Sequence, residues 1–501
     1  MRPLPSYIIP FLIFSFSLIL RYLFISKGPY DVEALNLAIR SVDLLEHHHL
    51  EMQTGLGYPL LVILGSFFVG FLRFFGCDDP VVAANFISVV LGAFNILLIY
   101  LFVKKIFTER CAVLSAILLS FNPLFLGLST YASSHMPAIF FFLLGLLSLF
   151  SYRHTARFRD ILLTGFYWGC FGATRIVDWG LLLPAMIFIH QKWTKPSLKE
   201  FLGFWAFTIL VVFAFYSPFF FQETRAQHSD FISRFWHSAL LDNFLGLISP
   251  NLFKGFGFLT QSLSLGGLLL ALIGLAALYR ANKEIGTLLI LWIAIPFMFY
   301  GNLRMTVTAR YFVVTIPALV IAIGFVLSRW AELFPSLKKI IYTGLIIFVI
   351  FLSMRVFPLI KIHHDQAILP EFCQWACQMT KPGAVIISAE EHRFIEHYTS
   401  CQTLVRPMSM NPIDSQSLLE FKNQVDSLLD QGVPLYITTA GLFAYDKNGN
   451  FSNFFLENYE GYFVGEHLYE DWHRHILQPQ IFSFELYQIE KKTSHASNEM
   501  R

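Results

Sequence analysis

Charge is scarce in this 501-residue chain. Only 14% of its residues are charged, where soluble domains carry about 25%. Hydrophobic residues make up 55% of the chain, and the mean hydropathy is +0.57. Such a chain cannot hide its apolar surface inside one soluble core. The composition therefore predicts an α-helical polytopic membrane protein.

Several signatures of soluble function are also missing. The sequence has no basic stripe and a formal net charge of only +2, so nothing favours nucleic-acid binding. It has no GxGxxG or GxxxxGK motif, so a nucleotide site is not indicated. None of the six cysteines forms a CxxC pair of the kind that binds zinc.

The cysteines near the C-terminus leave one alternative open. Cys373 and Cys377 are four residues apart, which is one turn of a helix. Either could form a disulfide with Cys401 if this region lies in an oxidising compartment. Buried free thiols are the simpler interpretation, and we favour it.

Long apolar runs recur from residue 7 to about residue 357. The first run lacks a small-residue cleavage site, so we expect a retained membrane helix rather than a signal peptide. About eleven spanning helices are expected. They are placed near residues 7–26, 81–103, 111–128, 136–152, 160–175, 179–191, 200–220, 263–279, 285–301, 312–328 and 339–356.

The run at residues 57–75 is ambiguous, and loop charge decides its interpretation. Basic residues mark the cytoplasmic side of a membrane. If this run does not cross, the basic loops all fall on one side; these are residues 104–110, 153–160, 191–200, 279–284 and 328–339. We therefore expect an interfacial or re-entrant helix there, a cytoplasmic N-terminus and an extracytoplasmic C-terminus. A bacterial inner membrane is the expected location.

The C-terminal part of the chain differs in character. Residues 1–357 are expected to form a transmembrane catalytic domain, and residues 358–501 an extracytoplasmic α/β domain. Residues 383–390 and 433–440 have the pattern of buried strands, while residues 416–432 have that of an amphipathic helix. Alternating strands and helices predict a partly parallel sheet.

Acidic and histidine side chains gather just after the first predicted span. Asp31 and Glu33 lie at the expected membrane boundary, where a carboxylate is costly to desolvate and is a functional candidate. They could equally be solvated loop charges. His48 and His49 belong to a run of three histidines, but consecutive side chains in an extended loop diverge and do not converge on one metal ion. A divalent metal is thus weakly supported, and no other cofactor is indicated.

Arginines on the expected outer side form the second group of candidates. Arg175 and Asp178 flank the outer end of a predicted span, and Arg304 and Arg310 lie in one loop. Arginine binds phosphate through paired N–H donors and keeps its charge. Structural ion pairing and anchoring at lipid headgroups are the alternatives.

The order of four motifs carries a family resemblance. These are "PYDVEALNLAI", "HHHLEMQTGLGYPLL", "GATRIVDWGLLLP" and "ARYFVVTIPAL". In sequence and spacing, residues 7–330 resemble the GT-C superfamily of membrane glycosyltransferases. The most similar branches are the protein O-mannosyltransferase-like and the lipid A aminoarabinose transferase-like enzymes.

The resemblance implies a sugar donor carried on polyprenyl phosphate, transferred with inversion at the outer leaflet to a protein, lipid or polysaccharide acceptor. It implies that Asp31 matches the catalytic aspartate of the family's first loop and is the general base, and Glu33 is a second catalytic candidate. Arg175, Arg304 and Arg310 would bind the donor phosphate. Further site candidates are His48, His49, Tyr58, His135 and Asp178.

The sequence departs from the family pattern at two places. Val32 separates Asp31 from Glu33, where many members have adjacent acidic residues. The second outer loop, "STYASSHMP", has His135 and no carboxylate. Two other classes therefore stay open, a transporter or flippase for a lipid or anionic solute, and an inactive scaffold of a glycan-assembly complex. Ionisable groups gathered at one face, rather than near the bilayer midplane, favour the transferase.

Overall fold

The computed structural model describes residues 7–30, 32–50, 58–218, 250–302, 308–389, 391–407, 415–443, 446, 449–471 and 480–492. The chain forms two compact units. The first consists mainly of residues 33–365, and the second mainly of residues 366–492.

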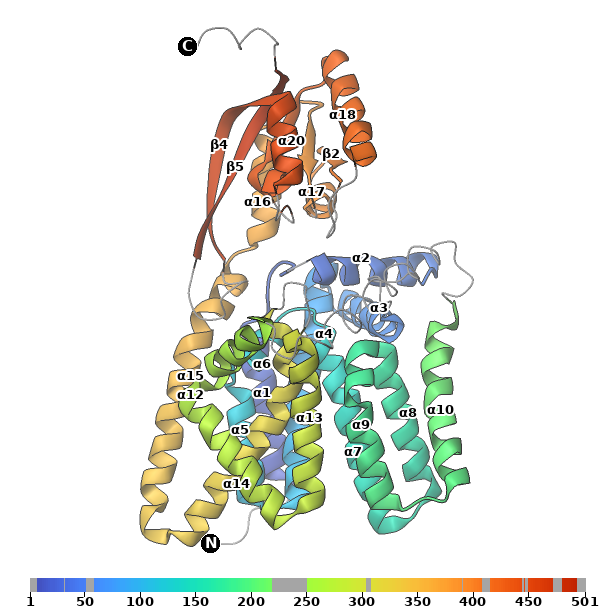
Figure 1. Cartoon of the computed structure of the whole chain (residues 1–501), viewed down its shortest axis with the longest axis vertical. Coiled ribbons are helices and arrows are strands. Elements are labelled where there is room, and N and C mark those ends of the chain that lie inside the picture. The colour runs from blue at the N-terminus through green and yellow to red at the C-terminus, as the bar shows by residue number, and fades with distance from the viewer. Residues whose placement is uncertain are drawn as a thin grey trace. The chain divides into compact units, whose positions relative to one another are not determined.

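The first unit is helical (Figure 1). Its helices are α1 (Ile8–Tyr22), α2 (Val32–His47), α3 (Pro59–Phe74), α4 (Pro80–Ile106), α5 (Glu109–Ser120), α6 (Pro123–Leu128), α7 (His135–Thr155), α8 (Phe158–Thr174), α9 (Ile176–Thr194), α10 (Leu198–Tyr216), α12 (Pro250–Ala281), α13 (Lys283–Asn302), α14 (Ile316–Leu333) and α15 (Lys338–Asp365), with 3-10 helices η3 (Ala309–Thr315) and η4 (Pro335–Leu337).

Among the described residues, seven helices are long and apolar enough to cross a membrane. They are α4, α7, α10, α12, α13, the stretch from η3 through α14, and the stretch from η4 through α15. Each of the other predicted segments is also helical, but α1, α5 and α8 have only 15, 12 and 17 residues. The multi-pass helical fold is thus confirmed, with fewer long spans than expected.

The ambiguous run at residues 57–75 contains α3. This helix has 16 residues and rises about 24 Å, less than the ~30 Å hydrocarbon core of a bilayer. Figure 1 shows α2 and α3 at the same end of the helices of this unit. Its length fits the interfacial placement that loop charge predicts.

The predicted single span at residues 111–128 is two helices in the structure. Helix α5 ends at Ser120 and α6 begins at Pro123. The side chain of Asn122 accepts a hydrogen bond from Phe125 N at 3.0 Å and caps the new helix. Proline lacks the N–H that a continuous helix needs, so it starts a helix here instead.

The second unit contains a five-stranded sheet with helices around it. Its elements are α16 (Ile368–Gln378), β1 (Val385–Ser388), α17 (His392–Tyr398), β2 (Gln402–Val405), α18 (Ser415–Asp430), β3 (Leu435–Thr438), α19 (Thr439–Phe443), α20 (Asn450–Asn458), β4 (Tyr459–Asp471) and β5 (Gln480–Lys491). The strand order is β2-β1-β3-β5-β4. Strand β1 pairs in parallel with β2 and β3, while β5 runs antiparallel to β3 and β4. The predicted strands contain β1 and β3, which confirms a mixed α/β fold.

The sheet buries its apolar face against α18 and α20. Phe421 and Val425 of α18 pack with Leu435 and Phe451 in one core cluster. Arg406, which is only 2% exposed, lies with its guanidinium 4.5 Å from the centre of the Phe451 ring. Burial lowers the pKa of this guanidinium.

One disulfide joins α16 to the residue before β2. It links Cys377 and Cys401, while Cys373 on the same helix is a fully buried free thiol. The alternative of a disulfide to Cys401 is therefore confirmed for Cys377. The favoured interpretation, buried free thiols, is wrong for Cys377 and Cys401 and confirmed for Cys373. A disulfide fits an oxidising compartment.

We expect non-reducing peptide mapping of the purified protein to recover Cys377 linked to Cys401 and Cys373 as a free thiol. The loop closed by this bond spans 24 residues, so its loss costs about 3 kcal/mol in the chain-entropy model. The double variant Cys377→Ser, Cys401→Ser should show earlier thermal unfolding. Cys373→Ser is the control for the mapping, and recovery of Cys373 in a disulfide would contradict the assignment.

Candidate active site

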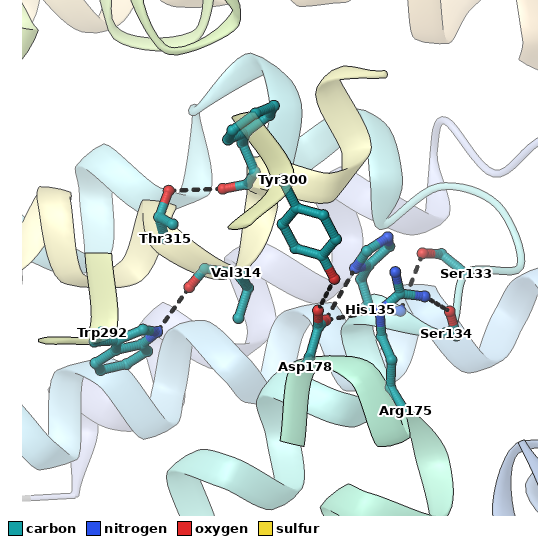
Figure 2. Close-up of polar contacts among 10 residues, drawn as sticks. Ser133, Ser134, His135, Arg175, Asp178, Trp292, Tyr300, Val314 and Thr315 are labelled. Atoms are coloured by element: carbon teal, nitrogen blue, oxygen red, sulfur yellow. Dashed lines mark hydrogen bonds and ion pairs between the residues drawn. The ribbon is translucent and has the colours of Figure 1, made fainter. Parts of the chain in front are cut away.

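A buried cluster of polar side chains surrounds the carboxylate of Asp178 (Figure 2). The side chain of Asp178 is 1% exposed, and its Oδ2 accepts a hydrogen bond from Arg175 Nε at 2.7 Å. The hydroxyl of Tyr300, from α13, donates to the other oxygen. His135 Nδ1, at the start of α7, lies 3.6 Å from Oδ2. Three helices far apart in the sequence thus converge on one carboxylate.

Helix ends explain why the chain places these groups together. Arg175 has an extended backbone (φ −158°, ψ 86°) and separates α8 from α9. Asp178 then falls in the first turn of α9, where the exposed N–H groups and the helix dipole favour a negative charge. His135 is the first residue of α7. Arg175, Asp178 and His135 therefore lie where helices begin, whereas Tyr300 comes from near the end of α13.

The guanidinium of Arg175 connects the cluster to two further segments. Arg175 Nη1 donates to Ser134 Oγ at 2.8 Å. Its Cζ lies 5.8 Å from the centre of the Tyr58 ring. The hydrogen bonds to Ser134 and Asp178 use two of the five N–H donors of the arginine. The side chain is 5% exposed, so its orientation is fixed by these contacts.

Tyr58 is held in an uncommon conformation. Its backbone lies in the left-handed region (φ 54°, ψ 52°) directly before Pro59, the first residue of α3. This conformation costs about 1–2 kcal/mol for a residue other than glycine, and such strain concentrates at functional sites. Burial raises the pKa of the Tyr58 phenol, so this residue is a neutral hydroxyl near Arg175.

A second arginine extends the cluster toward α2. Arg310 Nη2, in η3, lies 3.2 Å from Glu33 Oε1 in the first turn of α2. The Arg310 guanidinium also lies 5.6 Å from the centre of the Tyr311 ring. Tyr311 in turn stacks on Tyr300, with ring centroids 5.0 Å apart. The two arginines are thus linked through a pair of stacked tyrosines.

Exposure increases along this series of contacts. The side chain of Arg175 is 5% exposed, that of Arg310 is 22% and that of Glu33 is 37%. The Arg175 end of the site is therefore buried, and the Glu33 and Arg310 end is partly exposed.

The structure brings together six of the ten predicted site residues. These are Glu33, Tyr58, His135, Arg175, Asp178 and Arg310. Asp31 and Arg304 lie outside the described residues. His48 and His49 are exposed beyond the end of α2, about 22 Å along the helix axis from Glu33. The histidine run is therefore separate from the arginine cluster.

Sequence reasoning missed three residues of this site. Tyr300 donates a hydrogen bond to Asp178, and Ser134 accepts one from Arg175. Tyr311 stacks on Tyr300 and lies next to the Arg310 guanidinium. Tyr300 sits at the end of an apolar span, and the run "YASSHMP" before α7 is rich in hydroxyl groups. A polar residue at the end of a span is a usable signal, but it does not identify a partner.

Metal-binding geometry is absent from the described part of the chain. Within those residues, no group of three or more His, Cys, Asp or Glu side chains could hold a metal ion. The ordered charges are instead two guanidinium groups with one carboxylate each. Arginine pairs of this kind suit anionic oxygen ligands such as phosphates.

One protein family matches part of the chain in sequence. Residues 67–221 match the sequence model of the dolichyl-phosphate-mannose-protein mannosyltransferase family. No curated protein is significantly similar to the chain in sequence.

Three solved structures share the fold across almost the whole chain. ArnT from Cupriavidus metallidurans, bound to undecaprenyl phosphate, matches 97% of this chain and 98% of its own, with a TM-score of 0.61 and 12% identity. The oligosaccharyltransferase AglB from Archaeoglobus fulgidus, in complex with an inhibitory peptide and a dolichol-phosphate, matches 91% of this chain and 73% of its own (TM-score 0.55, 13% identity). The arabinofuranosyltransferase AftD from Mycobacteria matches 97% of this chain and 40% of its own (TM-score 0.51, 13% identity).

The chain has the GT-C glycosyltransferase fold. This likeness includes both units, because it extends over 97% of the chain. The predicted resemblance to the mannosyltransferase and aminoarabinose transferase branches is confirmed by the family match and by the fold. The matched family is described by dolichyl-phosphate-mannose, and the structures of ArnT and AglB named above contain undecaprenyl phosphate and a dolichol-phosphate.

The hydroxyl of Tyr300 should contribute to the stability of the first unit. Tyr300→Phe keeps the stacked ring but removes a donor from the buried carboxylate of Asp178, which costs about 1–3 kcal/mol. We expect thermal unfolding of the purified protein at a lower midpoint. Tyr279→Phe, the same change at a side chain that is 42% exposed, is the control. Equal midpoints for the two variants would contradict the bond.

Proposed function

We propose that this chain is an integral membrane glycosyltransferase that moves a sugar from a polyprenyl-phosphate donor to an acceptor on the extracytoplasmic side of the membrane. Asp31 is the general base, assisted by Glu33. Arg175, Arg304 and Arg310 bind the donor phosphate. The observation that carries the proposal is the convergence of Arg175 and Arg310 within the GT-C fold, next to the helix that Asp31 directly precedes in sequence.

The transfer step requires a base for the acceptor proton and cations for the negative charge that develops on the leaving phosphate. An acceptor hydroxyl attacks the anomeric carbon of the sugar while its proton passes to the carboxylate of Asp31. The bond between that carbon and the phosphate oxygen breaks, and the lipid phosphate leaves with its electron pair and an added negative charge. Donors placed in advance stabilise such developing charge most effectively where water is excluded. Arg310, which is 22% exposed, and the buried Arg175 supply them.

Asp178, Tyr300 and His135 act on Arg175 rather than on the substrate. Their contacts fix one face of the guanidinium, so its remaining N–H donors keep one direction. An arginine that is already oriented loses little side-chain entropy when a phosphate binds. The positioned cation therefore contributes to the leaving-group step without a rearrangement at the moment of reaction.

Two independent features support an extracytoplasmic site. The basic loops predict a cytoplasmic N-terminus and an outer position for Glu33 and Arg310, where a polyprenyl-phosphate donor and an external acceptor can meet. The disulfide between Cys377 and Cys401 suits an external second unit. The lipid of the donor would be of the same class as the undecaprenyl and dolichol phosphates found in the two related structures.

Asp31→Asn should abolish transfer, because loss of a general base typically lowers turnover 10²- to 10⁴-fold. The assay uses full-length protein in liposomes with a panel of polyprenyl-phosphate sugars. Donor binding and thermal unfolding should match the wild type. Asp43→Asn is the matched control, since Asp43 lies on α2, the helix that Asp31 directly precedes in sequence, and pairs with Arg40 at 3.5 Å. Turnover of Asp31→Asn within about threefold of wild type would exclude the role given to this residue.

Arg310→Gln tests whether this arginine binds the donor or only neutralises Glu33. If it binds the donor phosphate, we expect the KM for the donor to rise about tenfold or more, as for loss of a charge-assisted bond. The double variant Arg310→Gln, Glu33→Gln should then have the same raised KM for the donor. Recovery of wild-type KM in the double variant would show that Arg310 acts only on Glu33. Arg329→Gln, at a side chain that is 59% exposed, is the control.

A further inference from the structure

Helix α4 has a row of polar side chains in an otherwise apolar span. Asn85, Ser88 and Asn95 lie at positions that share one helix face, and each is 0% exposed. Polar groups inside a membrane span are costly unless they find hydrogen-bond partners. A row of three in one helix is therefore expected to hold something specific.

These three side chains of α4 form hydrogen bonds with residues 129–136, which we term the serine segment. The side chain of Asn85 connects two backbone segments. Its Oδ1 accepts from Ala132 N at 2.7 Å, and its Nδ2 donates to Ser26 O at 2.9 Å. The backbone of Ser26 itself donates to Thr130 O at 2.9 Å. Asn85 thus fixes the serine segment against the chain that leaves α1.

The other two side chains bind the segment further along. Ser88 Oγ accepts from Ser133 N at 3.0 Å. Asn95 Nδ2 donates to Met136 O at 2.9 Å. The three anchors therefore follow the segment in order, from Ala132 through Ser133 to Met136.

Two more residues allow the segment to lie this close. A side chain at Gly92 would meet Ser129 Cβ at 2.5 Å and Arg21 Nε at 3.1 Å, so only glycine fits between the helix and the segment. Arg21, fully buried in α1, donates to Ser129 Oγ at 2.9 Å. A buried cation is costly in a membrane span, and both Arg21 and Gly92 serve the same eight residues.

The far end of the serine segment is part of the active-site cluster. Ser134 Oγ accepts from Arg175 Nη1 at 2.8 Å, and His135 Nδ1 lies 3.6 Å from Asp178 Oδ2. Ser133 Oγ accepts from His135 N at 3.3 Å, which fixes the start of α7. Any shift of the segment therefore moves the acceptor that orients the Arg175 guanidinium.

We propose that Asn85 and Ser88 are positioning residues, which hold the serine segment so that Ser134 and His135 direct Arg175 toward the leaving phosphate. This rests on the proposed function. The residues touch no substrate and act only through the segment. Because Arg175 stabilises charge that develops in the transition state, their loss lowers kcat more than it changes the donor KM.

The decisive test compares Asn85→Leu with Asn85→Asp in full-length protein reconstituted in liposomes with the polyprenyl-phosphate sugar that the wild type uses. Asn85→Leu removes both hydrogen bonds, and we expect kcat to fall about 10- to 100-fold, as for a misplaced catalytic group. The donor KM should stay within about threefold, because Arg310 and its contacts are unchanged.

Asn85→Asp is the conservative rescue. When its carboxyl group is protonated, the O–H donates to Ser26 O and the carbonyl accepts from Ala132 N, which restores both bonds. As pH rises and the group ionises, the donor is lost. We therefore expect activity close to wild type at the acid end and a ratio to wild type that falls as pH rises. Arg21, His135 and His364 contact this region in both proteins, so their effects cancel in that ratio.

Thr208→Val is the matched control. Thr208 is fully buried in α10, and its hydroxyl donates only one turn back within its own helix, to Phe204 O at 3.0 Å. We expect unchanged kcat. If Asn85→Asp were as defective as Asn85→Leu at every pH, or if Asn85→Leu raised the donor KM as much as it lowered kcat, the positioning role would be overturned.

Amide hydrogen exchange separates this proposal from the proposed function. In Asn85→Leu, exchange at residues 130–134 should accelerate at least tenfold, while exchange in α8 stays at the wild-type rate. If wild type transfers no sugar from any donor, the proposed function fails but the exchange result still decides whether Asn85 anchors the segment. Unchanged exchange in Asn85→Leu would overturn the anchor itself.

Discussion

The ion pair between Arg175 and Asp178 is the interaction on which the rest of this site depends. Both side chains are at most 5% exposed in a helical bundle whose core is mostly apolar. Removing one partner of such a pair leaves an uncompensated buried charge, at a cost of about 3–5 kcal/mol. Further polar side chains therefore have to contact the pair. Tyr300, His135 and Ser134 do so from two other helices and the loop before one of them.

That requirement explains why polar residues accumulate in spans where they are otherwise costly. Ser134 can reach Arg175 only if the serine segment lies against α4, and the segment lies there because Asn85 and Ser88 bond its backbone. Each step satisfies a buried polar group with another one, and the series ends on backbone groups. The polar residues of α4 are thus explained by the active-site charge they support.

Exposure divides the site into a buried part and a partly exposed part. The Arg175 end is closed by packing, whereas Arg310 and Glu33 are partly exposed and share one ion pair. Ion pairs that are partly exposed contribute little to stability, about 0–1 kcal/mol, so the Arg310–Glu33 pair adds little to the stability of the fold. The stacked rings of Tyr300 and Tyr311 connect the two parts without adding charge.

The sequence by itself determined the class of the protein, because hydrophobic length and scarce charge leave only a membrane bundle. It also determined the mixed sheet of the second unit and singled out Arg175, Asp178 and Arg310 as candidates, since charges at span ends stand out against an apolar background. It left the pairing of Cys377 with Cys401 open and did not identify the partners of Tyr300 or Ser134. Only the tertiary structure decided which groups face one another, because hydrogen bonds across helices depend on helix rotation and depth, and apolar spans specify neither. The break between α5 and α6 shows the same limit: proline predicts an interruption, but the path of the chain beyond it is set by packing.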